Sequence, residues 1–199
     1  MMYQPQDFFF KKAKREGYPA RSVYKLQEID QKFHIFHQND IVLDLGCAPG
    51  SWLLYIQKVI QPKGKVIGID KKPISINSPA VFLQEDVFQL KPDELKKILA
   101  KEGKDKFDVI VSDLAPSTSG VKELDESRSL ELIKQAFSFT PPLLKKEGFF
   151  ICKAFESHEV HLFRKEISPY FKRLKIFKPR ASRKRSKELY LIGLHYLSC

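Results

Sequence analysis

The sequence has no uninterrupted apolar run near 18 residues, which is about the length that a helix needs to cross a bilayer. Its first residues also lack the charged segment followed by an apolar core that is typical of a secretory signal peptide. We therefore expect a cytoplasmic protein with no membrane partner.

Cysteine is scarce, with Cys47, Cys152 and Cys199 the three in the chain and no C-x-x-C pair among them. This spacing argues against both a disulfide framework and a zinc site. His158 and His161 lie three residues apart on a predicted helix, but no further ligand is in view, so we expect no bound metal.

Acidic residues are outnumbered, with 24 Asp and Glu against 35 Lys and Arg, and the net charge is +11. The excess gathers near the two ends of the chain. The two basic clusters are Lys11, Lys12, Lys14, Arg15, Arg21 and Lys25, and Lys172, Arg173, Lys175, Lys178, Arg180, Arg183, Lys184, Arg185 and Lys187. Two solvated faces would also account for them, but clustering at the ends favours a nucleic acid as partner.

Apolar runs predict seven strands, which lie at 41–45, 65–70, 81–83, 107–113, 148–155, 173–177 and 189–197. Helical patterns lie at 20–34, 52–60, 92–100, 127–144 and 159–168, and Pro141-Pro142 should kink or interrupt the fourth. The alternation predicts an α/β fold, a mostly parallel sheet with helices on both faces and an antiparallel pair at one edge. We expect a single domain over 1–199, of which 1–38 form an N-terminal helical extension.

The segment 41–52 joins the first strand to a helix through a turn that contains Gly46 and Gly50. Glycines let a ligand approach the backbone, and the helix N-terminus offers free N–H groups, which predicts a nucleotide-type cofactor site. A nicotinamide site would want G-x-G-x-x-G, whereas Pro49 and the acid Asp44 within the strand fit S-adenosylmethionine (SAM) better. Asp70 follows the turn by about 20 residues, where an acid can bind ribose hydroxyls.

Other polar residues fall at strand ends, where ligands of such sheets bind. Asp86 follows the third strand and is placed to meet a base edge, although a simple turn role is equally open. Lys153 interrupts an apolar strand, and Asp113 ends the strand before it. A buried lysine is costly unless an acid pairs with it or it does chemistry, so the alternatives are a structural ion pair and a catalytic one.

Two other kinds of methylase fit less well. One that acts on exocyclic amines would want an aromatic residue after Asp113-Leu114-Ala115-Pro116, and none follows. One that acts on base carbons would need a thiol nucleophile. Cys152 should point to the face opposite Lys153, and we interpret Cys47 as a packing residue.

Five motifs in order resemble those of the FtsJ/RrmJ family of ribosomal RNA 2′-O-methyltransferases over nearly the whole chain. They are Ala20-Arg21-Ser22-Val23-Tyr24-Lys25-Leu26, Asp44-Leu45-Gly46-Cys47-Ala48-Pro49-Gly50-Ser51-Trp52, Ser112-Asp113-Leu114-Ala115-Pro116, Lys153-Ala154-Phe155 and Ser182-Arg183-Lys184-Arg185-Ser186-Lys187-Glu188-Leu189-Tyr190. Ser51 departs from the family pattern, where a second glycine is common. Ala154-Phe155-Glu156-Ser157 also departs from it, replacing a Val-Phe-Gln-Gly-like segment.

The resemblance implies a Rossmann-like SAM-dependent methyltransferase fold and a Lys-Asp-Lys-Glu catalytic tetrad. The tetrad carries over to Lys25, Asp113, Lys153 and Glu188, and the SAM contacts to Gly46, Pro49, Gly50, Trp52, Asp70, Asp86 and Asp113. Lys153 would take or share the proton of a ribose 2′-hydroxyl while that oxygen attacks the methyl group of SAM.

The two basic clusters would then bind RNA phosphates. The residues that we expect to bind RNA are Lys11, Lys12, Arg15, Arg21, Arg180, Arg183 and Arg185. The resemblance implies an enzyme whose substrate is a uridine of 23S ribosomal RNA in the large subunit, and we expect a monomer. The alternatives are another RNA such as tRNA, and a catalytically idle RNA-binding assembly factor. A nicotinamide oxidoreductase fails on the glycine turn.

Overall fold

The computed structural model describes residues 8–78, 80–117, 119–183 and 186–197. Seven strands form one sheet in the order β3-β2-β1-β4-β5-β7-β6. The strands are β1 (Ile41–Leu45), β2 (Lys65–Asp70), β3 (Val81–Gln84), β4 (Phe107–Ser112), β5 (Leu144–Phe155), β6 (Phe171–Phe177) and β7 (Glu188–Tyr196). Parallel pairing joins β3, β2, β1, β4 and β5, whereas β7 runs antiparallel to both β5 and β6. The predicted antiparallel pair is therefore at the edge of the sheet, with β6 outermost.

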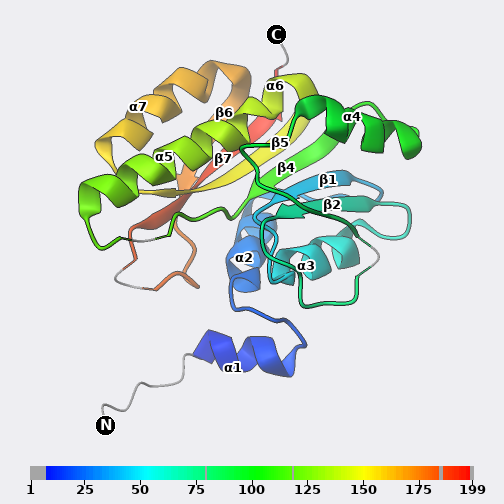
Figure 1. Ribbon diagram of the computed structural model, residues 1–199, viewed down its shortest axis with the longest axis horizontal. Coiled ribbons are helices and arrows are strands. Elements are labelled where there is room, and N and C mark those ends of the chain that lie inside the picture. The colour runs from blue at the N-terminus through cyan, green and yellow to red at the C-terminus, as the bar shows by residue number, and fades with distance from the viewer. Residues whose placement is uncertain (1–7, 79, 118, 184–185, 198–199) are drawn as a thin grey trace.

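Helices cover both faces of the sheet (Figure 1). They are α1 (Phe8–Arg15), α2 (Val23–Phe33), α3 (Ser51–Ile60), α4 (Pro92–Lys101), α5 (Lys122–Ser138), α6 (Thr140–Leu143) and α7 (His158–Ile167), and a 3₁₀ turn, η1 (Ser168–Tyr170), precedes β6. Alternate residues of β1 enter different cores, because successive side chains of a strand point to opposite faces. Leu43 belongs to the hydrophobic cluster that includes residues of α4, α5 and α7, whereas Val42 belongs to the cluster that includes residues of α2 and α3.

Helix α1 lies apart from the sheet (Figure 1) and packs on α2 instead. Ala13 is buried against Val23 and Tyr24, and the Phe9 and Tyr24 rings lie 5.4 Å apart between centroids. Phe8 and Phe10 are exposed. Helix α1 is thus anchored to α2, the helix that carries Lys25.

Several boundaries differ from the sequence prediction, since α5 begins at Lys122 rather than at 127 and β6 at Phe171 rather than at 173. The helix expected at 127–144 is two helices, since Pro141 and Pro142, which cannot donate backbone hydrogen bonds, occupy the start of a separate short helix. Strand β5 begins at Leu144 rather than at 148, with a bulge at which Glu147 has φ 65°. The charged residues of this bulge interrupt the apolar pattern and hide the start of the strand.

Among the described residues, no helix is both long and apolar enough to cross a membrane.

Candidate active site

The turn between β1 and α3 brings backbone close to the loop that follows β4. Gly46 has φ 81°, and a Cβ atom there would lie 2.9 Å from the backbone nitrogen of Leu114. Gly50, with φ 110°, precedes α3, and a Cβ atom on it would meet Ile76 at 2.5 Å. Both positions combine a left-handed backbone with a close approach, and glycine is the residue that tolerates both.

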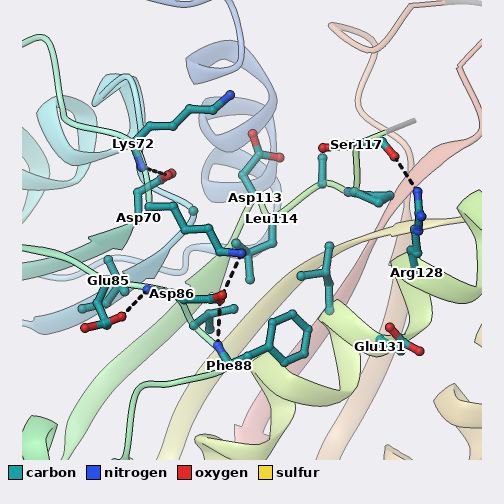
Figure 2. Close-up of a pocket in the computed structure, with 17 residues that line it drawn as sticks. Asp70, Lys72, Glu85, Asp86, Phe88, Asp113, Leu114, Ser117, Arg128 and Glu131 are labelled. Atoms are coloured by element: carbon teal, nitrogen blue, oxygen red, sulfur yellow. Dashed lines mark hydrogen bonds and ion pairs between the residues drawn. The ribbon is translucent and has the colours of Figure 1, made fainter. Parts of the chain in front are cut away.

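A cavity of about 550 Å³ opens at the carboxyl ends of β1, β2, β3 and β4. Figure 2 shows Asp70 and Asp86 on one side of this hollow and Arg128 and Glu131 of α5 on the other. Gly46 and Asp113 also line it. The cavity lies where ligands bind in open α/β sheets.

Asp70 is fixed by two backbone donors. The N–H of Ala48 donates to Oδ2 at 2.9 Å, and the N–H of Lys72 donates to Oδ1 at 2.8 Å (Figure 2). Each carboxylate oxygen keeps a second acceptor position, because it has two lone pairs. Asp70 therefore offers oriented acceptors to a ligand with hydroxyl groups.

Asp86 is held on the same side of the cavity. The N–H of Phe88 donates to Oδ1 at 3.0 Å, and Lys71 Nζ lies 2.7 Å from Oδ2. The ammonium of Lys71 lowers the pKa of Asp86. This carboxylate is ionised at neutral pH and presents acceptors only.

Lys153 and Asp113 form the buried ion pair that the sequence allowed. Lys153 Nζ lies 2.9 Å from Asp113 Oδ1 and donates to the main-chain carbonyl of Asp113 at 2.6 Å. The Lys153 side chain is 8% exposed and that of Asp113 is 17% exposed. Of the described residues that line the cavity, Asp113 is the one that belongs to the predicted tetrad, so it joins the cavity to Lys153.

Lys25 and Glu188 form a second ion pair, with 2.7 Å between Nζ and Oε1 and side chains 12% and 13% exposed. Lys153 is paired in register with Tyr190 on β7, and Phe155 with Glu188. Residues two apart on a strand share a face, so Glu188 and Lys153 lie on the face covered by α2. The fold thus brings all four predicted residues to one face as two ion pairs.

Three residues that were expected to contact the cofactor are not among the described residues that line the cavity. The Trp52 indole is buried, and its N–H donates to the carbonyl of Ser22 at 3.0 Å. Pro49 and Gly50 are not among the described residues that line the cavity. Trp52 thus attaches α3 to the start of α2 in this structure, and its contact with a cofactor stays a prediction.

The predicted RNA-binding residues fall into three groups. Lys11, Arg15, Arg180 and Arg183 are exposed. Lys12 is partly buried, with Nζ 3.9 Å from Glu16 Oε1, and Arg21 donates to the carbonyl of Ala181. Arg185 lies outside the described residues.

Two residues have roles that the sequence did not reveal. The Tyr190 hydroxyl, fully buried, donates to Asp113 Oδ1 at 2.9 Å, the same oxygen that pairs with Lys153. Ser51, the departure from the family pattern, accepts a hydrogen bond from the N–H of Ala20 at 2.7 Å. The alternation of β7 places Tyr190 on the Lys153 face, but no pattern indicates the Ser51 contact.

The thiols are placed for packing. Cys47 and Cys152 are both buried, and burial raises the pKa of Cys152 to about 12. Cys152 packs in the core beside α5, on the face opposite Lys153, as predicted. Burial also raises the pKa of Cys47, so both thiols are protonated and poor nucleophiles at neutral pH.

Asp44 is a carboxyl group in the sheet interior, fully buried, and neither of its oxygens has a hydrogen-bond partner in the described part of the chain. Burial, followed by the charges of Asp113 and Asp70, raises its pKa well above the ordinary value. Between the ordinary pKa of about 4 and the raised pKa, the folded protein holds a proton on Asp44 that the unfolded chain has released.

We expect Asp44→Asn to change how stability depends on pH. Between about pH 4 and the raised pKa the folded wild type binds one more proton than the unfolded chain, so its stability falls as pH rises. The asparagine variant lacks this dependence. Its free energy of unfolding relative to wild type should therefore rise by about 1.4 kcal/mol per pH unit in that range. Urea unfolding of both proteins at pH 5, 6 and 7 measures the difference. Parallel pH profiles would show that Asp44 is ionised in the folded state.

Comparison with known proteins finds relatives of one kind. Residues 18–196 match the sequence profile of the FtsJ-like methyltransferase family. The chain is 43% identical over 196 residues, 98% of either chain, to ribosomal RNA large subunit methyltransferase E of Bdellovibrio bacteriovorus. It is 44% identical to the protein of that name from Lawsonia intracellularis, over 96% of this chain and 95% of the relative. A crystal structure described as that of a ribosomal RNA methyltransferase from Plasmodium falciparum superposes with a TM-score of 0.79 at 29% identity, covering 92% of this chain and 100% of the other.

Proposed function

Because the chain belongs to the FtsJ-like methyltransferase family, we propose that it methylates a ribose 2′-oxygen of large-subunit ribosomal RNA, with SAM as methyl donor. The observation that carries the proposal is the buried Lys153–Asp113 pair beside the cavity. The acceptor that we propose is a uridine of 23S ribosomal RNA, and the reaction takes place in the cytoplasm.

The residues around the cavity suit SAM. Gly46 leaves room where a Cβ atom would press on the Leu114 backbone. Asp70 would hold the ribose hydroxyls through its remaining lone pairs, and Asp86 would accept from the base edge. When bound, the sulfonium supplies an electrophilic methyl group.

Lys153 would act on the 2′-hydroxyl, which is a weak acid whose proton must be taken or shared. Its Nζ contacts two oxygens of Asp113, at 2.9 and 2.6 Å, which fixes the direction of the nitrogen. In the neutral amine two N–H groups would donate to these oxygens, and the lone pair would be left to take the proton of the 2′-hydroxyl. The Tyr190 hydroxyl holds the same carboxylate from the opposite strand. The Lys25–Glu188 pair would border the acceptor ribose, and holding the two reactants in line contributes several kcal/mol.

Methyl transfer from labelled SAM to large ribosomal subunits tests the proposal, with subunits taken from cells that lack the gene. We expect a 2′-O-methylated nucleoside after complete digestion of the RNA. Label in a base, label in tRNA instead of the large subunit, or no transfer would contradict the proposal.

The exposed arginines predict a strong salt dependence of RNA binding. Each phosphate contact releases counterions, so Arg183→Ala should flatten the plot of log affinity against log salt by about 0.7 to 0.9 units. Lys101→Ala, on the last turn of α4, removes the same charge away from both basic clusters and serves as the control. Titration of labelled RNA at several salt concentrations measures the slopes, and equal slopes for the two variants would exclude a phosphate contact at Arg183.

A further inference from the structure

One face of α2 and the turn before it contacts the C-terminal basic segment. Arg21, Lys25 and Glu28 are spaced four and three residues apart, which places them on the same side of a helix. Arg21 and Glu28 bind the backbone of Arg180 and Ala181, and Lys25 binds the side chain of Glu188.

Glu28 makes the most specific of these contacts. Its carboxylate accepts hydrogen bonds from two consecutive backbone N–H groups, Arg180 to Oε2 at 2.7 Å and Ala181 to Oε1 at 2.8 Å. Hydrogen bonds in which one partner is ionised are about twice as strong as neutral ones, and two parallel bonds also fix an orientation. The backbone at these two positions is therefore held in one direction relative to α2.

The Ala181 residue is fixed from other sides as well. The Arg21 guanidinium donates to its carbonyl oxygen. Its methyl group is fully buried in a cluster with Ala13, Val23 and Tyr24. The loop is thus attached to the N-terminal extension at the point where the two basic clusters meet.

The attached segment carries groups that the proposed function needs. Arg180 and Arg183 on it are exposed, and it leads into Glu188, the partner of Lys25. It also has local bonds of its own, from the N–H of Ser182 to the carbonyl of Pro179 at 3.0 Å and from Lys178 Nζ to the carbonyl of Ser186 at 2.7 Å. Its far end is held by other elements, since the N–H of Glu156 donates to the carbonyl of Lys187 at 2.9 Å and Lys187 Nζ lies 3.6 Å from Glu126 Oε1. Its first part, at Arg180 and Ala181, is held by the contacts with α2.

We propose that Glu28 is a positioning residue for RNA binding, which orients Arg180 and Arg183 of the basic segment 178–183 through the N–H groups of Arg180 and Ala181. This inference rests on the proposed function and adds to it a residue that touches neither RNA nor cofactor. An acidic residue that strengthens binding to a polyanion can be recognised by the effect of neutralising it on RNA affinity. Neutralising it should weaken RNA binding, although the protein becomes more positive, whereas simple Coulomb attraction predicts tighter binding.

The test compares the full-length variants Glu28→Gln, Glu28→Asp and Glu166→Gln. Glutamine keeps the length but turns an amide N–H₂ toward a backbone donor, and aspartate keeps the charge but falls short by one methylene. Glu166 is exposed on α7, and its replacement makes the same charge change far from the segment. We expect the KM for RNA to rise about tenfold in both Glu28 variants, with kcat within about threefold of wild type and SAM affinity unchanged. Glu166→Gln should bind RNA as well as wild type or slightly better.

Amide hydrogen exchange of the free protein separates the possible failures. The Arg180 and Ala181 amides should exchange faster in both Glu28 variants. If wild type methylates RNA and the variants match its KM, the positioning role is overturned, whatever the exchange rates. If wild type neither binds nor methylates RNA, the proposed function fails and the RNA role of Glu28 fails with it. The exchange rates then still report whether the carboxylate holds the segment.

Discussion

Replacing Lys153 by methionine is expected to lower the rate of methyl transfer by about 10²- to 10⁴-fold, the range typical of a lost proton-transfer group. Methionine fills the buried volume of the lysine side chain without its nitrogen. Asp113, which lines the cavity, keeps its hydrogen bond from Tyr190, so the SAM site should keep its shape. Single-turnover transfer to ribosomal subunits and SAM binding by calorimetry measure the two effects separately.

Lys146→Met is the matched control, because Lys146 lies exposed near the other end of the same strand, β5. It should transfer methyl groups at the wild-type rate. Full activity of Lys153→Met would show that Lys153 is a structural partner of Asp113. Lost SAM affinity with an otherwise normal rate at saturation would instead make Lys153 a cofactor residue.

Replacing Gly46 by alanine is expected to weaken SAM binding about 100-fold. The new methyl group would lie 2.9 Å from both the backbone nitrogen and Cδ2 of Leu114, at a backbone φ of 81°. The loop after β4 must shift to accept it, and that loop lines the cavity together with Asp113. Equilibrium binding of SAM measures the loss.

Gly103→Ala separates the steric effect from backbone strain. Gly103 has φ 68°, but nothing lies within 4 Å of a Cβ atom at that position. The substitution should cost about 1 kcal/mol of stability and leave SAM affinity unchanged. Equal SAM affinity in Gly46→Ala and wild type would show that the cofactor does not depend on the approach of Gly46 to Leu114.

The parts of the fold that follow from periodicity are predictable from this sequence. The β1 strand at 41–45 and the pairing of Lys153 with Asp113 follow from apolar runs and from the meeting of neighbouring parallel strands at their carboxyl ends. The start of β5 does not follow from the sequence, because Lys145, Lys146 and Glu147 break the apolar pattern at a bulge.

Contacts between segments that are distant in the sequence cannot be predicted from periodicity. Lys25 and Glu188 are far apart in the chain, and the family resemblance, rather than any spacing, predicted that they act together. The Glu28 contact was hidden because its partners are backbone N–H groups, which every residue except proline carries. Trp52 shows the opposite case, since a motif position that suggested a cofactor contact donates to the Ser22 carbonyl in this structure.

The proposed activity of this chain is methylation of a ribose of large-subunit ribosomal RNA. Mapping of 2′-O-methyl groups on ribosomal RNA tests it most directly, in cells with the gene, without it, and with the Lys153→Met form. We predict one 2′-O-methylated nucleotide of 23S RNA that is lost on deletion, restored by the wild-type gene and not restored by the variant. An identical methylation map in all of these cells would contradict the account.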